Sequence, residues 1–181
     1  MEQHSISTSR LRLRTLLPVD CSERYVSWLN QPEINRYLET RFEPPQTLES
    51  VRSYVSAVAE RSNEQLFGIF LDDGVRHVGN IKVGPISNPH RVGDVSLLIG
   101  ERDCWGQGIA TEAIQAVCRY AFVQLHVRKL SAGMYAPNRG STRAFEKAGW
   151  RHEGIRRDHY LLDDSPCDVV ILGLRPSDLP G

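Results

Sequence analysis

The sequence has no excess of charge of either sign, because 22 lysines and arginines are matched by 22 aspartates and glutamates. Such a chain has no overall positive field to hold nucleic acid or an anionic membrane surface. No apolar run approaches the roughly 18 residues that span a bilayer. The N-terminal stretch also lacks the apolar core of a secretory signal. We therefore expect a cytoplasmic protein with no nucleic-acid or membrane partner.

Cysteine is scarce and scattered. Cys21, Cys104, Cys118 and Cys167 form no C-x-x-C pair and have no histidine at ligand spacing beside them. Disulfide frameworks and zinc sites depend on such spacings. We therefore expect reduced thiols and no metal site.

Length and composition are those of an ordinary folded chain. The 181 residues, 40% of them hydrophobic, are enough for one domain with a substantial core and too few for two. We expect a single domain over residues 1–181.

Strand and helix patterns follow one another from the N-terminal end. Charged and apolar residues alternate over 10–16, which predicts a half-buried strand. A turn and a helix should follow, with Asp20 as the cap. Pro32 should open a second, short helix, and residues 44–61 predict a third helix capped by Thr47.

The rest of the chain continues this mixture. The predicted elements are a hairpin over 65–86 that turns at Asp72-Asp73-Gly74, a strand over 94–100, a helix over 108–125, a strand over 128–136, a helix over 138–149, and a closing hairpin over 150–174. The order β-α-α-β-β-β-α-β-α-β-β predicts one α/β domain on a mixed sheet.

The segment WGQGIAT, residues 105–111, places two glycines directly before the long helix. The first turn of a helix has unpaired N–H groups and a positive dipole end, so it binds anions. Glycine removes side-chain bulk that would keep a phosphate away from the backbone. An ATP-binding loop needs Lys and then Ser or Thr after its last glycine, but Ile109 stands there. A dinucleotide site needs a third glycine, where this chain has Thr111.

The same segment carries a family resemblance. WGQGIATEA, preceded by the strand DVSLLIG and followed by YAPNRGSTRAFEKAGW, resembles the GNAT superfamily of acetyl-CoA-dependent N-acetyltransferases. Within it, the pattern is similar to the branch typified by the RimJ and RimL ribosomal-protein acetyltransferases. The resemblance covers about 9–174 and is strongest over 94–150. It implies a mixed, mostly antiparallel central sheet flanked by helices, with a splayed pair of central strands that holds the cofactor.

The resemblance also implies which residues contact acetyl-CoA. The family's pyrophosphate loop, Q/R-x-x-G-x-G/A, falls on residues 105–110, with Trp105 in place of the usual first residue. The implied contacts are Leu98, Ile99, Gly100, Trp105, Gly106, Gln107, Gly108, Ile109, Ala110, Thr111, Asn138 and Ser141. Asn138 has a second interpretation as a helix cap, and the two roles are compatible.

The chemistry is attack by an amine on a thioester carbonyl. An alkylamine has a pKa of about 10, so a base must remove its proton at neutral pH. In the family this base is often a carboxylate at the start of the central strand, which implies Asp94, with Glu33 and His77 as lesser candidates. A solvated strand-end carboxylate is the alternative interpretation of Asp94. Backbone N–H groups of the central strand should stabilise the charge that develops on the carbonyl oxygen.

The acid that protonates the leaving thiolate is less evident. Many members of the family use a tyrosine at the position of Phe145, and phenylalanine has no proton to donate. A thiol pKa of about 8.5 makes the thiolate a fair leaving group without help. Ser141 and Tyr135 are the candidates to replace the tyrosine.

The acceptor should lie under the segment between the first strand and the first hairpin. Its candidate contacts are Trp28, Glu33, Tyr37 and Arg41, with Tyr160 on the opposite wall. Trp28 has an alternative interpretation as a core anchor. The segment resembles family members that act on nucleotide-linked amino sugars.

Three functions follow from these patterns. The first is N-acetylation of a small-molecule primary amine, and the second is acetylation of protein N-termini. The third is a non-catalytic acyl-CoA-binding module. A monomer and a homodimer are both compatible with the sequence.

Overall fold

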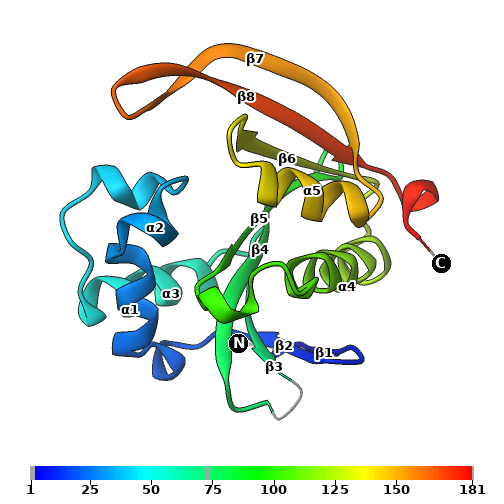
Figure 1. Ribbon diagram of the computed structural model, residues 1–181. Helices are drawn as coiled ribbons and strands as arrows, with labels where there is room; N and C mark the ends of the chain where they lie inside the picture. Colours follow the sequence, from blue (N-terminus) through cyan, green and yellow to red (C-terminus); the bar gives the residue numbers. More distant parts are fainter. Residues whose placement is uncertain (1–2, 72–73, 181) are drawn as a thin grey trace.

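Strands from both ends of the chain and from its middle form one sheet. The computed structural model describes residues 3–71 and 74–180, and their strands join in the order β1-β2-β3-β4-β5-β6-β8-β7 (Figure 1). The strands are β1 Ser5–Ser7, β2 Leu11–Thr15, β3 Gln65–Leu71, β4 His77–Ser87, β5 Val92–Ile99, β6 Lys129–Tyr135, β7 Arg151–Leu162 and β8 Ser165–Leu174. Neighbouring strands are antiparallel except β5 and β6, so the predicted mixed, mostly antiparallel sheet is confirmed.

Helices cover both faces of this sheet. They are α1 Glu23–Asn30, α2 Pro32–Asn35, α3 Leu48–Ala59, α4 Ile109–Val123 and α5 Arg139–Lys147, with short 3-10 turns η1 Pro18–Asp20, η2 Glu39–Phe42, η3 Arg102–Cys104 and η4 Pro176–Asp178. In Figure 1, α1 to α3 lie on one side of the sheet, and α4 and α5 lie on the other.

Two hydrophobic clusters attach these layers to the sheet. The larger one includes Ala113, Ile114 and Val117 of α4, which are fully buried against the sheet at the helical spacing seen in the sequence. The smaller one joins α1 and α3 to the opposite face through side chains such as Val51 and Val55. Because strand residues alternate between faces, β5 contributes to both clusters.

The parallel pair β5–β6 separates along its length. The two strands pair at Val92 with Lys129, at Gly93 with Leu130 and at Asp94 with Ser131. Beyond these positions β5 continues beside β4 alone, and β6 continues beside β8. This divergence confirms the predicted splay, and its closed end lies at Asp94.

Some predicted features differ from the structure. Asp20 does not cap α1, so that prediction is wrong. Its carboxylate accepts hydrogen bonds from Arg14 at 2.7 and 2.8 Å and from the Leu17 N–H at 2.9 Å. The helix begins three residues later, where Ser22 accepts from the Tyr25 N–H at 3.3 Å.

The predicted cap of α3 and the predicted closing hairpin are found where expected. Thr47 accepts from the Ser50 N–H at 3.1 Å and caps α3. The closing hairpin turns at Asp163 and Asp164, both with positive φ. Of the predicted turn Asp72-Asp73-Gly74, the two aspartates lie outside the described residues. The short strand β1 was not predicted.

Within residues 3–71 and 74–180, no helix combines the length and the apolar character needed to cross a bilayer.

Candidate active site

The closed end of the splay presents a carboxylate. Asp94 is exposed at the start of β5, and it shares a face with Leu98, which packs against the α1–α3 cluster. The protein around Asp94 removes water from one side of the carboxylate and raises its pKa, while the nearby charges of Lys82 and Arg156 oppose this shift. A carboxylate in this position can accept a proton from an amine that enters on this face.

Residues 105–111, which contain the predicted pyrophosphate loop and are called the cofactor loop below, lead into the start of α4. Gly108 is the N-cap residue, with φ +80°, and no side chain caps the helix. Gly106 has φ +74°, and a Cβ placed there would meet no atom within 4 Å. No hydrogen-bond acceptor for the N–H groups of residues 106–111 is found in the described part of the chain. These donors, with the helix dipole and the open space over Gly106, fit a pyrophosphate.

The exposed indole of Trp105, the first residue of this loop, is hydrogen-bonded to the end of β5. Its Nε1–H donates to the Ile99 carbonyl at 2.9 Å, and the residue is 45% exposed. Trp105 therefore lies along the open end of the splay, between β5 and the loop.

Asn138 and Ser141 occupy the start of α5. The Asn138 side-chain oxygen accepts from the Ser141 N–H at 3.2 Å, so the cap role is observed. For the Asn138 amide nitrogen and the Ser141 hydroxyl, no partner is found among residues 3–71 and 74–180. Phe145, one turn further, is 2% exposed and packs edge-on against Trp150, with ring centroids 4.8 Å apart.

Tyr135 ends β6 in a polar cluster. Its hydroxyl donates to Glu39 Oε1 at 2.9 Å and accepts from Arg41 Nη2 at 2.9 Å. Burial raises the pKa of Tyr135, and the neighbouring Glu39 adds to the rise while Arg41 opposes it. The tyrosine proton is thus already engaged with Glu39, which sequence reasoning did not single out.

Two parts of the chain meet over the splay. We call residues 23–43, which include α1, α2 and η2, the acceptor arm. Its Arg36 pairs with Asp163 at the turn of the β7–β8 hairpin at 2.7 Å, and Arg41 Nη2 donates to the Leu161 carbonyl at 2.7 Å. In Figure 1 this hairpin curves over the sheet with its turn directed toward α2.

Aromatic rings reinforce this closure. Ring centroids of Tyr37 and Tyr135 lie 5.8 Å apart, and those of Tyr135 and Tyr160 lie 5.0 Å apart. The structure therefore brings together three of the residues predicted for the acceptor, Tyr37, Arg41 and Tyr160, with Tyr135. A hollow of about 640 Å³ adjoins them, lined by residues of the arm and its following loop, including Glu33 and Arg41, and by Asp163.

Trp28 is not in this group, and its assignment to the acceptor wall is corrected. The ring is 2% exposed, and its Nε1–H donates to Glu101 Oε1 at 2.8 Å. It therefore anchors α1 to the end of β5, as the alternative interpretation stated.

The two lesser base candidates are also placed elsewhere. Glu33 is exposed and pairs with Arg102, just before the cofactor loop. His77 is buried, and burial lowers its pKa; its Nε2 lies 2.8 Å from Asn80 Oδ1. It stands at the end of β4 opposite to the residues that pair with the start of β5, so neither side chain lies beside Asp94.

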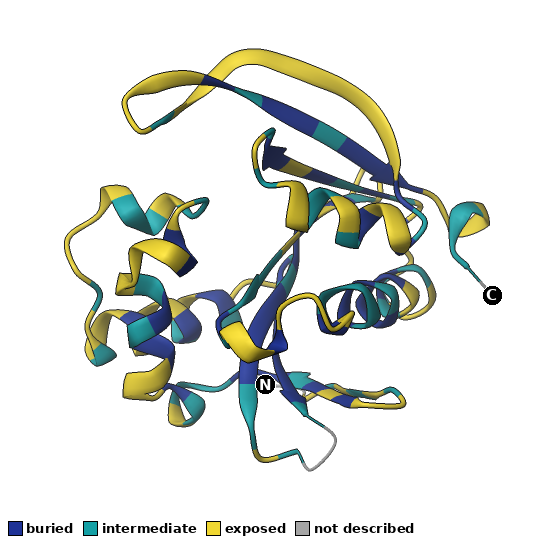
Figure 2. Ribbon diagram, viewed as in Figure 1, coloured by how far each residue is buried: buried dark blue, intermediate teal, exposed yellow. Residues whose placement is uncertain are grey.

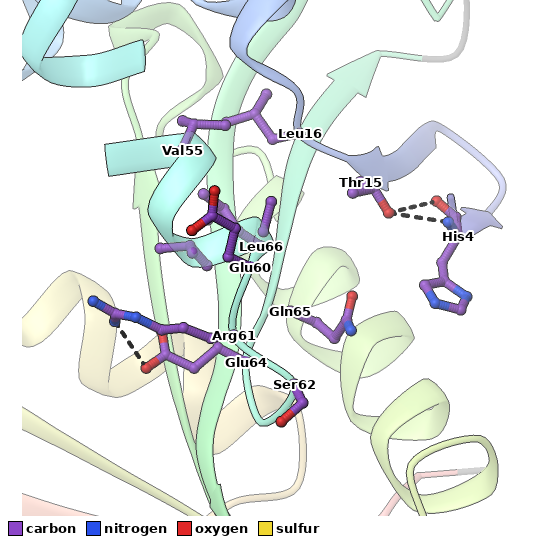
Figure 3. Close-up of a pocket in the computed structure, with 12 residues that line it drawn as sticks. His4, Thr15, Leu16, Val55, Glu60, Arg61, Ser62, Glu64, Gln65 and Leu66 are labelled. Carbon is purple, nitrogen blue, oxygen red and sulfur yellow. Dashed lines mark hydrogen bonds and ion pairs between the residues drawn. The ribbon is translucent and has the colours of Figure 1, made fainter. Parts of the chain in front are cut away.

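A second, smaller hollow of about 220 Å³ lies between α3 and the start of β3 (Figure 3). Glu64 on its wall is paired with Arg61 and, beyond the hollow, with Lys82, at 3.1 Å each. None of the residues predicted for catalysis or binding lines it. No cluster of three potential metal ligands is found in the described ranges.

Comparison with known proteins agrees with this geometry. Residues 10–151 match the acetyltransferase (GNAT) domain family. The chain is 33% identical over 139 residues to the probable N-acetyltransferase YjcK of Bacillus subtilis, covering 73% of this chain and 75% of that protein. The chain therefore belongs to the GNAT acetyltransferase family and is an acetyl-CoA-dependent N-acetyltransferase.

Solved structures share the fold. Spermidine N-acetyltransferase from Vibrio cholerae, in complex with CoA and spermine, superimposes with a TM-score of 0.82 at 20% identity, covering 94% of this chain and 98% of that one. RimJ of Mycobacterium smegmatis, in complex with CoA-disulfide, gives a TM-score of 0.82 at 18% identity, covering 99% and 90%.

Proposed function

We propose that this enzyme acetylates a primary amine of a small molecule, with Asp94 as the general base. The observation that carries this proposal is the position of Asp94 at the closed end of the β5–β6 splay, exposed and on the face of β5 where Leu98 packs against the α1–α3 cluster. In this proposal the pantetheine chain of acetyl-CoA runs along Leu98, Ile99 and Gly100. The pyrophosphate rests on the N–H groups of residues 106–111, and Asn138 adds a side-chain contact.

Acetyl-CoA supplies the acetyl group as a thioester. Asp94 accepts a proton from the incoming ammonium, which frees the nitrogen lone pair to form the new N–C bond. Backbone N–H groups of β5 stabilise the negative charge on the carbonyl oxygen. As the C–S bond breaks, the Ser141 hydroxyl is free to donate a hydrogen bond to the sulfur, whereas the Tyr135 proton is engaged with Glu39.

Closure of the acceptor face favours a small molecule over a peptide. The Arg36–Asp163 pair and the Arg41 contact to Leu161 join the two walls above the sheet. An extended polypeptide needs an open groove, whereas these contacts bridge the acceptor arm and the hairpin. The RimJ/RimL branch and protein N-terminal acetylation are therefore the less favoured form of this proposal.

Unpaired arginines favour an acceptor that carries an anionic group. No described carboxylate forms an ion pair with Arg41 or Arg156. Arg41 uses three hydrogen bonds, to Leu38, Tyr135 and Leu161, and a guanidinium has five N–H donors. Spare donors of this kind suit a phosphate, as in a nucleotide-linked amino sugar, and they disfavour polyamines, which carry only positive charge.

The test is release of free CoA from acetyl-CoA with separate acceptor sets. These are nucleotide-linked amino sugars, polyamines with aminoglycosides, and peptides with varied N-termini. Turnover confined to the first set supports the proposal. Turnover on peptides alone would replace it with protein N-terminal acetylation, and turnover on polyamines alone would show that the unpaired arginines do not select the acceptor.

A further inference from the structure

Arg10, the first arginine of the alternating segment 10–16, contacts the cofactor loop rather than its own strand neighbours. It stands directly before β2, and its Nη1 donates to the Gln107 carbonyl at 2.9 Å. Its Nη2 would lie 3.4 Å from a Cβ placed on Gly108. The guanidinium therefore lies against the start of α4.

The same guanidinium holds a carboxylate in the first turn of α4. Arg10 Nε donates to Glu112 Oε2 at 2.7 Å, and Nη2 lies 2.6 Å from the same oxygen. Glu112 also accepts from the Arg10 N–H at 3.0 Å and from the Thr8 hydroxyl at 2.5 Å. Burial acts to raise the pKa of Glu112, but the hydrogen bonds from Thr8 and Arg10 outweigh it, so the pKa is lowered.

Two consequences follow for the loop. The Gln107 carbonyl and the Gly108 N–H belong to one planar trans peptide, so holding the carbonyl on Arg10 directs that N–H to the opposite side. Glu112 places a negative charge within one turn of the donors that would bind pyrophosphate. Arg10 compensates this charge, which would otherwise repel the ligand.

We propose that Arg10 is a positioning residue for acetyl-CoA, acting through Gln107 and Glu112. This inference rests on the proposed binding of pyrophosphate at residues 106–111. It assigns a purpose to the first arginine of the alternating segment, which the strand pattern alone does not require.

The chain contains a matched control on the same segment. Arg14 forms a similar two-bonded pair with Asp20, at 2.7 and 2.8 Å, but it faces the start of α1 instead of α4. Arg14→Ala therefore removes a comparable arginine–carboxylate pair without touching the cofactor loop.

The experiment measures the binding of free CoA by calorimetry for the wild type, Arg10→Ala, Arg10→Lys, Arg10→Ala/Glu112→Gln and Arg14→Ala. We expect Arg10→Ala to raise the Kd for CoA about tenfold, as an uncompensated charge near a phosphate would. The Kd of Arg10→Lys should lie between those of the wild type and Arg10→Ala, because lysine keeps the charge and loses the two-bonded geometry. The double variant should recover part of the loss, and Arg14→Ala should bind as the wild type does.

Two further readouts separate positioning from a general structural defect. The loss in Arg10→Ala should shrink as salt is added, because the repulsion from Glu112 is screened. In steady-state assays, KM for acetyl-CoA should rise while kcat at saturation changes little. Unchanged CoA affinity in Arg10→Ala, or an equal loss in Arg14→Ala, would overturn the inference. Failure of the wild type to bind CoA would instead contradict the proposed cofactor site.

Discussion

At the scale of single residues, the environment of Asp94 combines opposing influences. Partial removal of water raises its pKa, and the charges of Lys82 and Arg156 pull it back. A raised pKa makes the carboxylate a stronger base than an ordinary aspartate.

We therefore expect Asp94→Asn to lower kcat/KM by about 10²- to 10⁴-fold, because the amide cannot accept the proton. Binding of CoA, measured by calorimetry, should be unchanged. Glu153→Gln is the control, since it removes another carboxylate beside the sheet, one that is paired with Lys129 at 2.7 Å. Near wild-type turnover in Asp94→Asn would remove Asp94 from the mechanism.

The pH dependence tests the same residue from another direction. Protonation of Asp94 removes the base, so kcat/KM should fall as the pH drops through its pKa, above the ordinary aspartate range. Arg156 lowers this pKa, so Arg156→Gln should move the acidic limb of the profile to higher pH. An acidic limb that stays in place in Arg156→Gln would show that another group controls it.

Ser141 and Tyr135 make different predictions. The Ser141 hydroxyl is without a partner in the described ranges, whereas Tyr135 bridges Glu39 and Arg41. Ser141→Ala should lower kcat about tenfold with little change in acceptor KM, because a hydrogen bond to the leaving sulfur is lost. Tyr135→Phe should instead raise acceptor KM, because it releases Arg41. Steady-state kinetics with both substrates varied measures the two effects. A fall in kcat for Tyr135→Phe together with an unchanged kcat for Ser141→Ala would reverse the two roles.

At the scale of elements, the splay could be predicted and its surroundings could not. The order of strand, glycine turn, helix and strand over 94–136 is local information, and the family resemblance supplied the divergence of β5 and β6. Asp20 was assigned to α1 because it precedes the helix as a cap would. The competing partner, Arg14, lies on another element, and only the tertiary structure shows the pair.

Contacts between distant parts of the chain also explain why Trp28 was assigned to the acceptor wall and why the roles of Glu39 and Arg10 were not predicted. Trp28 has the residue type of a binding side chain, but its burial depends on α1 packing against Gly100. Glu39 and Arg10 act on partners more than 90 positions away in the chain, at Tyr135 and at Gln107 with Glu112. Their charge and position gave no local sign of these contacts.

The contact between α1 and the end of β5 leaves no room for a side chain on Gly100. A Cβ placed there would lie 2.0 Å from Trp28 Cδ2. Gly100→Ala should therefore displace the buried indole and lower the free energy of unfolding by about 1–3 kcal/mol. Urea denaturation measures the loss, and tryptophan emission should shift to the red.

Gly140→Ala provides the comparison for Gly100→Ala. A Cβ at Gly140 meets no atom within 4 Å, and the residue lies in the first turn of α5. Alanine should leave stability unchanged or increase it by up to about 1 kcal/mol, because it favours the helix. Equal free energies of unfolding for the two variants would mean that the Trp28 side chain moves aside without loss of stability.

At the scale of the whole molecule, the acceptor face is bounded by parts that are distant in sequence. The acceptor arm follows β2, while the hairpin that meets it comes after α5 and includes the edge strand β7. Figure 2 shows this strand exposed along nearly its whole length, whereas β8 is partly buried and pairs with β6 from Leu174 to Val169. Past that pairing, the turn region of the hairpin contacts Arg36, Arg41 and Tyr135.

The Arg36–Asp163 pair should therefore matter more for the acceptor than for stability. The two side chains are 52% and 71% exposed, and exposed ion pairs contribute about 0–1 kcal/mol to folding. Arg36→Ala and Asp163→Gly should each leave the unfolding transition nearly unchanged, because glycine accepts the positive φ at residue 163 where alanine would be strained. Each should raise acceptor KM about fivefold, the equivalent of roughly 1 kcal/mol, because the hairpin is released from the arm.

A double-mutant cycle distinguishes this bridge from two independent effects. If the pair acts as one contact, Arg36→Ala/Asp163→Gly should raise acceptor KM no more than either single variant does. KM for acetyl-CoA should stay constant, because the cofactor loop lies at the start of α4 and not under the hairpin turn. Lys129→Ala, which breaks another ion pair on this sheet, serves as the control. Additive losses, or a parallel rise in KM for acetyl-CoA, would show that the two side chains affect the fold rather than the enclosure of the acceptor.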